Sequence, residues 1–131
     1  MHEMALMRNV VDMVLEECKH SDDIIRVVSV HLTIGEMRDV IDEYVPSMFR
    51  FLARGTIAED AEVSIEHVPM RVRCLGCGEI FRIDPHDQGT WTCPRCDAFQ
   101  NYRLFSGDEF RIGLIEVERR AAPVEKLARV V

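Results

Sequence analysis

The chain has 131 residues, enough for one domain or for a small domain that carries a smaller insert. Its formal net charge is −7 and its pI is near 5.2, so we do not expect nucleic acid as a partner, because clustered Lys and Arg are needed to neutralise phosphates. No apolar run is long enough to cross a bilayer and the first residues lack a signal-peptide pattern, which predicts a cytoplasmic protein without a membrane partner.

The first half of the chain predicts helix, strand and helix. Apolar residues recur at three- and four-residue intervals from Met4 to Cys18, which indicates one helical face. Residues 26–34 alternate between apolar and polar and predict a half-buried strand. After Glu36 the spacing of apolar residues is helical again until Gly55, and Pro46 is expected to kink or delay this second helix. The apolar residues of this second helical pattern are Ile41, Val45, Met48 and Leu52.

The second half predicts two strands that bracket an insert. Residues 62–68 and 110–118 alternate, and Gly113 marks a change of phase that fits a β-bulge. We therefore expect an α+β fold in which two helices pack on a three-stranded, mainly antiparallel sheet with an inserted four-cysteine zinc ribbon. The expected nickel-binding α/β domain comprises 1–69 plus 107–120, the zinc-binding domain comprises 70–106, and 121–131 is a tail that could be disordered.

Two close cysteine pairs provide the strongest chemical signal. The pairs are Cys74–Cys77 and Cys93–Cys96, with fifteen residues between them. Two intervening residues allow both sulfurs of a pair to reach one ion from a tight turn, and four thiolates close a tetrahedron around zinc. A closed tetrahedron leaves no position for water or substrate, so the metal is expected to be structural. Iron remains the alternative metal, because similar turns also bind it.

The charge of the insert argues against a nucleic-acid ribbon. Five arginines stand against four acidic residues between residues 70 and 106. Four thiolates around a divalent ion contribute about −2, which makes the local balance slightly negative. We therefore expect no arginine-rich stripe in this segment.

The amino terminus is a second candidate metal site. The terminal amine of Met1, the amide and imidazole nitrogens of His2, and an amide nitrogen or carboxylate oxygen of Glu3 can chelate one ion together. Nitrogen donors in a tetragonal arrangement suit Ni(II) and Cu(II). A histidine at position two is a weak signal by itself, since exposed terminal histidines are common.

The remaining histidines, acidic residues and cysteine are simpler to explain structurally. His31 and His67 fall in predicted strands, and Cys18 fits the helical stripe as a small buried side chain. The acidic run from Glu36 to Glu43 is most simply a solvated helix face. Three residues could instead add a nickel ligand, namely His86, Asp39 and Asp42.

Together, four features resemble the HypA/HybF family of hydrogenase maturation proteins over residues 1 to about 118. These are the Met1-His2-Glu3 start, the Ile34-Gly35-Glu36 turn, the paired cysteines and the closing segment FRIGLIEVE. The resemblance implies a nickel metallochaperone that catalyses no reaction. It implies Ni(II) binding at the amino-terminal segment, with ligands matching His2 and Glu3, and structural zinc on Cys74, Cys77, Cys93 and Cys96.

The resemblance also implies partners. They are a nickel-handling maturation GTPase and the large-subunit precursor of [NiFe]-hydrogenase, with the urease accessory system as a second recipient in some bacteria. One departure from the family is Asp97, which follows Cys96 where many relatives have glycine. Asp tolerates turn conformations better than most residues, so zinc binding is expected to survive.

Two other functions stay open at this point. One is a zinc-ribbon adaptor that binds protein or nucleic acid and has no functional nickel site, and the other is an iron redox carrier. The sequence does not decide between a monomer and a homodimer, or between hydrogenase and urease as recipient.

Overall fold

The computed structural model describes residues 3–127, which fall into two compact units. Within this range, unit 1 contains residues 3–33, 40–66 and 111–127, and unit 2 contains residues 34–39 and 67–110. Each unit has a sheet, and strands that belong mainly to unit 1 continue into unit 2. Among the described residues, no helix is long and apolar enough to cross a membrane.

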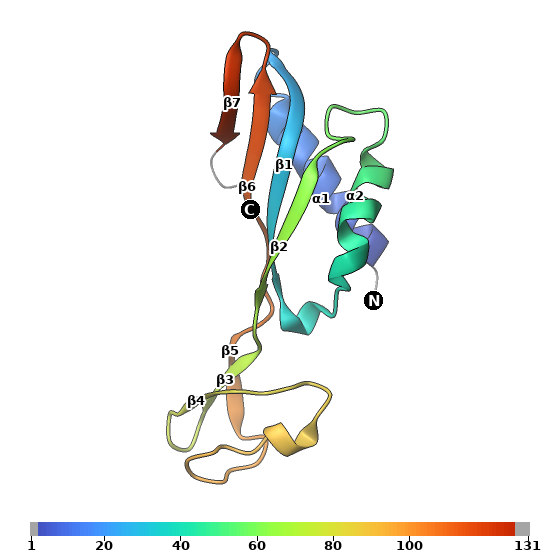
Figure 1. The fold of residues 1–131 in the computed structure, drawn as a ribbon. Helices are drawn as coiled ribbons and strands as arrows, with labels where there is room; N and C mark the ends of the chain where they lie inside the picture. Colours follow the sequence, from blue (N-terminus) through green and yellow to red (C-terminus); the bar gives the residue numbers. More distant parts are fainter. Residues whose placement is uncertain (1–2, 128–131) are drawn as a thin grey trace. The chain divides into compact units, whose positions relative to one another are not determined.

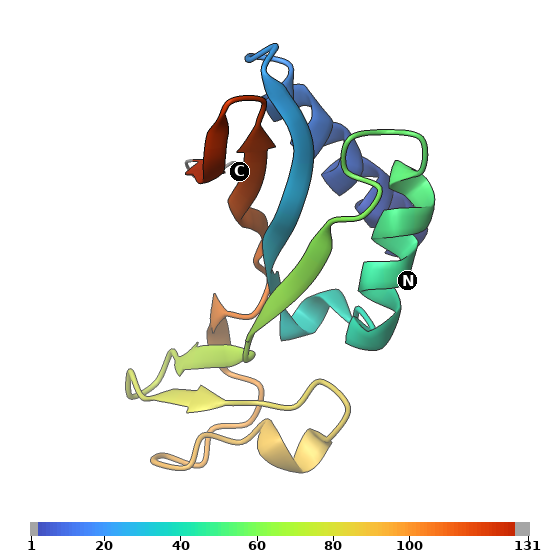
Figure 2. The ribbon, with the colours of Figure 1, turned by 45° about the horizontal axis from the view of Figure 1, so that its top comes forward.

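Unit 1 is built on a four-stranded sheet with the order β2-β1-β6-β7. The strands are β1 (Ile24–Gly35), β2 (Glu62–Val68), β6 (Phe110–Arg119) and β7 (Ala122–Leu127). β1 and β2 run in the same direction, with helix α2 as the connection between them (Figure 1). α1 and α2 lie on one face of this sheet, as the turned view in Figure 2 also shows. The structure confirms the predicted α+β class.

The helix α1 (Glu3–Cys18) follows the predicted pattern closely. Its buried residues repeat at the three- and four-residue spacing that the sequence shows, and they face the sheet. They are Met7, Val10, Val11, Val14 and Cys18. Each is at most 5 % exposed, so this stripe supplies much of the core of unit 1.

The second helix is shorter than predicted. The short 3₁₀ turns η1 (Glu36–Arg38) and η2 (Asp42–Tyr44) precede α2, which spans only Val45–Ala53. Pro46 stands in the first turn of α2, where a missing N–H costs nothing because no acceptor exists for it. Pro46 therefore delays the helix, and Ile41 is left 47 % exposed outside it. Val45, Phe49 and Ala53 form the buried face.

The strands β1 and β6 carry the other half of the core. Val30, Leu32 and Ile34 of β1 are buried on the predicted apolar face. In β6 the buried residues Ile112 and Ile115 are separated by an odd number of positions, so the alternation changes phase across Gly113. This agrees with the phase change that the sequence predicts there.

The strand β7 was not predicted, and the expectation of a disordered tail was wrong for residues 122–127. This segment pairs antiparallel with β6, with Glu116 opposite Lys126. β7 is the edge of the sheet and has one neighbouring strand, so its sequence needs no strict alternation and tolerates a proline. The sheet therefore has four strands and not three.

Unit 2 has a three-stranded antiparallel sheet with the order β4-β3-β5. The strands are β3 (Arg71–Cys74), β4 (Ile80–Arg82) and β5 (Tyr102–Ser106), and a 3₁₀ turn, η3 (Gln88–Thr90), lies between β4 and β5. Val72 and Ile83 are its buried aliphatic residues within 67–110. So small an apolar core indicates that something else stabilises this unit.

Candidate metal centre

The four cysteines of the two predicted pairs converge in unit 2. The Sγ atoms of Cys74 and Cys96 are 3.6 Å apart, those of Cys77 and Cys93 are 3.5 Å apart, and all four lie within 4.8 Å of one another. A disulfide needs about 2.05 Å between its sulfurs, so these thiols are free. A metal bonded at roughly 2.3 Å to four tetrahedral sulfurs sets them about 3.8 Å apart. The four sulfurs are therefore placed so that they could hold one metal ion.

The two cysteine turns repeat the same backbone pattern. In the first, the Cys74 carbonyl accepts a hydrogen bond from Gly78 N at 2.9 Å, and in the second the Cys93 carbonyl accepts one from Asp97 N at 3.0 Å. Each turn also directs a backbone N–H at its first sulfur, from Gly76 to Cys74 at 3.3 Å and from Arg95 to Cys93 at 3.4 Å. Donors of this kind stabilise a thiolate, which is the form that binds metal.

Asp97 adopts the conformation that glycine has in the matching turn. Its φ is 64°, and that of Gly78 is 80°. This is the left-handed region, which Asp and Asn enter more readily than other non-glycine residues. Asp97, which stands where many relatives have glycine, therefore keeps the hydrogen-bond pattern of the first cysteine turn.

A β-branched residue at position 97 should weaken metal binding. Asp97→Val is expected to raise the free energy of the left-handed turn conformation by about 1–3 kcal/mol. Zinc affinity should fall roughly tenfold, since the turn must form for both sulfurs to bind. Asp97→Gly should bind as well as the unaltered chain or better. Competition with a chromogenic chelator measures both. Arg95→Val, in the same turn without a left-handed φ, is the matched control, and equal affinities for the two valine variants would contradict the prediction.

Backbone hydrogen bonds and neighbouring thiols shift the pKa values of Cys74 and Cys96 in opposite directions. A backbone hydrogen bond from Cys77 is the main reason that the pKa of Cys74 falls to about 7. At Cys96 a backbone hydrogen bond from Ala98 lowers the pKa, but the Cys74 thiol, burial and the other thiols together raise it to about 12. Four adjacent sulfurs therefore do not all lose their protons until a cation compensates their charge.

The turn Ile34-Gly35-Glu36 is part of unit 2 and is held by the backbone. Gly35 N donates to the Glu109 carbonyl at 2.6 Å, and Met37 N donates to the Gly107 carbonyl at 2.8 Å. A Cβ on Gly35 would lie 2.0 Å from the Gly107 carbonyl oxygen, so only glycine fits here.

Glu36 is not on a solvated helix face, and that interpretation of the acidic run was wrong for this residue. Its Oε1 accepts a hydrogen bond from Met70 N at 3.0 Å, and its Oε2 accepts one from Arg82 Nη2 at 2.7 Å. The reason is that residues 36–38 form a 3₁₀ turn beside β3 and not the start of a long helix. The Ile34-Gly35-Glu36 motif was the sequence signal that could have indicated this role.

Of the three predicted nickel-site residues, Glu3 is the one that the structure describes. Met1 and His2 are outside the described residues. Glu3 is the first residue of α1, and its Oε2 accepts a hydrogen bond from Ile41 N at 3.4 Å. The structure therefore places one of the three predicted nickel-site residues and leaves that site a prediction.

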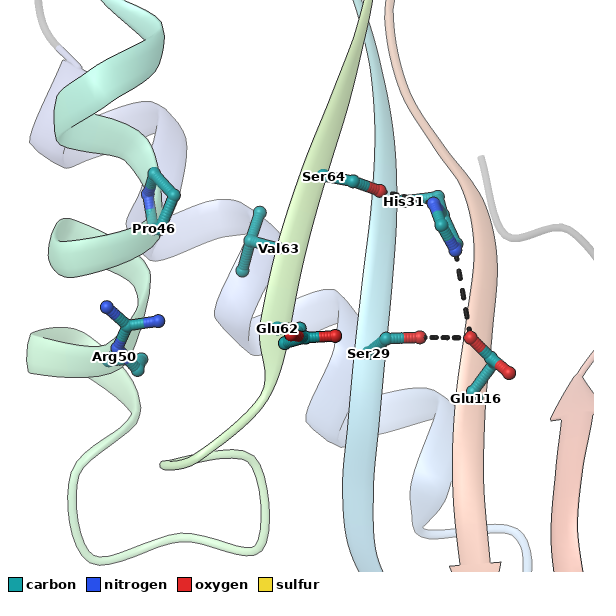
Figure 3. Close-up of a pocket in the computed structure, with 8 residues that line it drawn as sticks. All are labelled: Ser29, His31, Pro46, Arg50, Glu62, Val63, Ser64 and Glu116. Atoms are coloured by element: carbon teal, nitrogen blue, oxygen red, sulfur yellow. Dashed lines mark hydrogen bonds and ion pairs between the residues drawn. The ribbon is translucent and has the colours of Figure 1, made fainter.

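His31 belongs to a polar cluster on the sheet of unit 1 (Figure 3). Its Nδ1 is hydrogen-bonded to Ser64 Oγ, and its Nε2 lies 3.8 Å from Glu116 Oε1. The Ser29 hydroxyl donates to the same carboxylate oxygen at 2.5 Å and is the main reason that the pKa of Glu116 is lowered. The cluster joins β2, β1 and β6 across the face opposite the buried Val30, and this agrees with a structural role for His31.

His86 and Cys18 are not part of the metal cluster. His86 Nε2 lies 4.0 Å from Asp39 Oδ1, and both side chains are exposed. Cys18 is buried in unit 1, and burial raises the pKa of its thiol, which keeps it protonated and a poor ligand. Within residues 3–127, the four cysteines of unit 2 are the one group of three or more His, Cys, Asp or Glu side chains placed to hold an ion.

Comparison with protein-family models shows the family to which this chain belongs. The family model described as hydrogenase/urease nickel incorporation, metallochaperone, HypA matches residues 1–117. The chain belongs to the HypA family. As a HypA-family protein it is a metallochaperone of hydrogenase maturation and nickel incorporation, and not an enzyme.

Individual HypA proteins agree with this assignment. The hydrogenase maturation factor HypA of Geobacter sulfurreducens is 36% identical over 118 residues, which cover 90% of this chain and 100% of the relative. That of Geobacter metallireducens is 35% identical over 122 residues, with the same coverage. The solution structure of the Ni metallochaperone HypA from Helicobacter pylori has a TM-score of 0.57 at 21% identity and covers 98% of this chain and 99% of that one, which shows a common fold.

Proposed function

We propose that this HypA-family chain binds Ni(II) at residues 1–3 and delivers it during the maturation of [NiFe]-hydrogenase, while zinc holds unit 2 together. The family match over residues 1–117 carries the proposal, because it includes the amino terminus and both cysteine pairs. The nickel ligands would be the amine of Met1, the amide and imidazole nitrogens of His2, and the amide nitrogen or carboxylate of Glu3.

The start of α1 supports this ligand set. The first N–H groups of a helix have no acceptor within the helix, so the backbone nitrogen of Glu3 is not committed to the hydrogen bonds of α1. Backbone and imidazole nitrogens in one plane suit Ni(II) better than Zn(II). An open site on a chain terminus can also release its ion, which a chaperone must do.

The geometry of the cysteine cluster supports zinc as the resident metal. Four thiolates in two turns are typical of structural zinc sites, which have no open coordination position. The zinc would be held by Cys74, Cys77, Cys93 and Cys96. Iron binds similar turns, so metal analysis of the purified protein separates the two metals, and stoichiometric iron would exclude zinc.

The proposed partners follow from hydrogenase maturation. The chain would exchange nickel with a maturation GTPase and deliver it to the hydrogenase large-subunit precursor. The urease accessory system would be a second recipient. A reducing cytoplasm would keep the four thiols available to zinc. The chain would work as a monomer or a homodimer.

Nickel titration tests the proposal. Zinc-loaded protein without a tag is expected to bind one Ni(II) per chain, and His2→Ala should weaken binding by more than the roughly 10–100-fold that loss of a supporting hydrogen bond costs at a metal site. Residues added before Met1 should have a similar effect, because they block the amine. Isothermal titration calorimetry and the absorption of the nickel complex measure both.

The matched control is His20→Ala, which removes an exposed histidine in the turn after α1. It should bind nickel as tightly as the unaltered chain. If His2→Ala and the extended chain bind nickel with unchanged affinity, the amino-terminal nickel site is wrong. If neither the unaltered chain nor any variant binds nickel, a zinc-ribbon adaptor without a nickel site is the better assignment.

A further inference from the structure

One face of the unit 2 sheet carries four arginines, although the charge count of the insert predicts no such stripe. In the register of the sheet, Arg71 lies opposite Arg82, and Arg73 lies opposite Ile80 on one side and Arg103 on the other. Residues directly opposite each other in a sheet point to the same face. We call this the arginine face, and its members are Arg71, Arg73, Arg82, Arg103, Ile80 and Phe105. All six are exposed.

Phe105 joins this face through a β-bulge. The register of β3 against β5 shifts between Arg71 and Val72, which leaves Phe105 between the paired residues Leu104 and Ser106. The guanidinium of Arg73 lies over the Phe105 ring, 5.6 Å from its centre, and the ring is 52 % exposed. The face therefore combines positive charge with a small apolar surface.

We propose that the arginine face binds a short acidic segment of a partner protein. The carboxylates of that segment would pair with the arginines, and its apolar side chains would pack on Ile80 and Phe105. The face would bind this segment whether or not residues 1–3 hold nickel.

The face already binds one carboxylate of its own unit. Arg82 Nη2 donates to Glu36 Oε2 at 2.7 Å, which shows that an arginine of this face can be paired in place. Among residues 3–127, no carboxylate forms an ion pair with Arg71, Arg73 or Arg103. Planar guanidinium groups donate two parallel hydrogen bonds to a carboxylate, so these three arginines can donate to an external acidic side chain.

Charge and size favour a protein segment over nucleic acid. The strands of this sheet have three to five residues, and at about 3.3 Å per residue the face matches only a few residues of extended peptide. The chain as a whole carries −7, which repels a long polyanion that extends beyond the face. One exposed ring, already covered in part by Arg73, provides little surface for base stacking.

The face can be changed without disturbing the metal site. Val72 and Cys74, which alternate with Arg71 and Arg73 along β3, point to the opposite face and are 0 % and 2 % exposed. A charge reversal at Arg103, which has no ion pair among residues 3–127, is therefore expected to leave the buried side of the sheet as it is.

Binding of a labelled peptide of alternating glutamate and leucine tests the proposal. Fluorescence anisotropy with the full, zinc-loaded chain should show binding that weakens as salt rises, and Arg103→Glu should weaken it about fivefold or more. The matched control, Arg50→Glu, reverses an exposed arginine of α2, outside the arginine face and the metal cluster, and should bind the peptide normally. Zinc content and Trp91 emission confirm that both variants are folded.

Three results would overturn the proposal. They are no binding of the glutamate peptide at low salt, equal weakening by Arg103→Glu and Arg50→Glu, and tighter binding of single-stranded RNA than of the peptide. A lysine–leucine peptide of the same length should not bind, and its binding would show that the contact is apolar only.

Discussion

Replacement of Cys77 by serine is expected to unfold unit 2 while the helices of unit 1 remain. Among residues 34–39 and 67–110, the buried apolar residues are Ile34, Val72, Ile83 and two of the cysteines themselves. So small a core does not offset the conformational entropy of ordering the segment, whereas a bound structural zinc contributes apparent free energies of about 10–16 kcal/mol. Loss of one thiolate should remove most of that contribution.

Two signals separate the units in this experiment. Trp91 is the single tryptophan of the chain and lies in unit 2, where its Nε1 donates to the Asp84 carbonyl at 2.8 Å. Its emission should shift to the red in Cys77→Ser and in the unaltered chain treated with a strong chelator. The far-ultraviolet signal of α1 and α2 should persist, because both helices belong to unit 1.

The matched control is Cys18→Ser, which alters the cysteine that is not a ligand. Cys18 is 5 % exposed in the core of unit 1, so this variant should lower the stability of the helices by about 1–3 kcal/mol and leave zinc content and Trp91 emission unchanged. A Trp91 spectrum that does not respond to Cys77→Ser or to metal removal would show that the cluster does not hold unit 2 together.

Gly35→Ala is the second substitution with a large expected effect. The added Cβ would lie 2.0 Å from the Gly107 carbonyl oxygen and 2.6 Å from Asp108 N, and backbone atoms cannot move aside as a flexible side chain can. The hydrogen bonds from Gly35 to Glu109 and from Met37 to Gly107 should break together. We expect a loss of about 3–5 kcal/mol, which urea unfolding followed by Trp91 emission measures.

Gly113→Ala is the control for this change. A Cβ on Gly113 would have its nearest neighbours at 3.6 and 4.0 Å, which are ordinary contacts. Its unfolding midpoint should therefore stay close to that of the unaltered chain. Equal midpoints for Gly35→Ala and Gly113→Ala would mean that the contacts of residues 34–36 with the rest of unit 2 do not contribute to its stability.

Periodicity predicted the elements in which one face is less exposed than the other. α1, β1, β2 and β6 meet this condition, and their predicted ranges differ from the observed ones by one or two residues at most ends. The cysteine turns were predicted because ligand spacing is a local property. Asp97 could be anticipated for the same reason, since its turn depends on residues close in sequence.

The rest depends on contacts between distant residues. Ile41 follows helical spacing with Val45, yet it stays outside α2 because Pro46 fits only a first turn. β7 forms because β6 offers a free edge, and its own alternation is too weak to show it. The charge count missed the arginine face because it averaged over loops, whereas pairing of β3 with β4 and β5 collects the arginines on one side.

The segments of the two units alternate along the chain, which delays the point during synthesis at which either unit can fold. Residues 34–39 emerge early but join a unit that is complete only at residue 110, and unit 1 lacks β6, an inner strand of its sheet, until residue 119 has emerged. Neither unit can close while most of the chain is still being synthesised. Metal capture by unit 2 and assembly of the main sheet are therefore expected within the short interval in which residues 110–119 emerge.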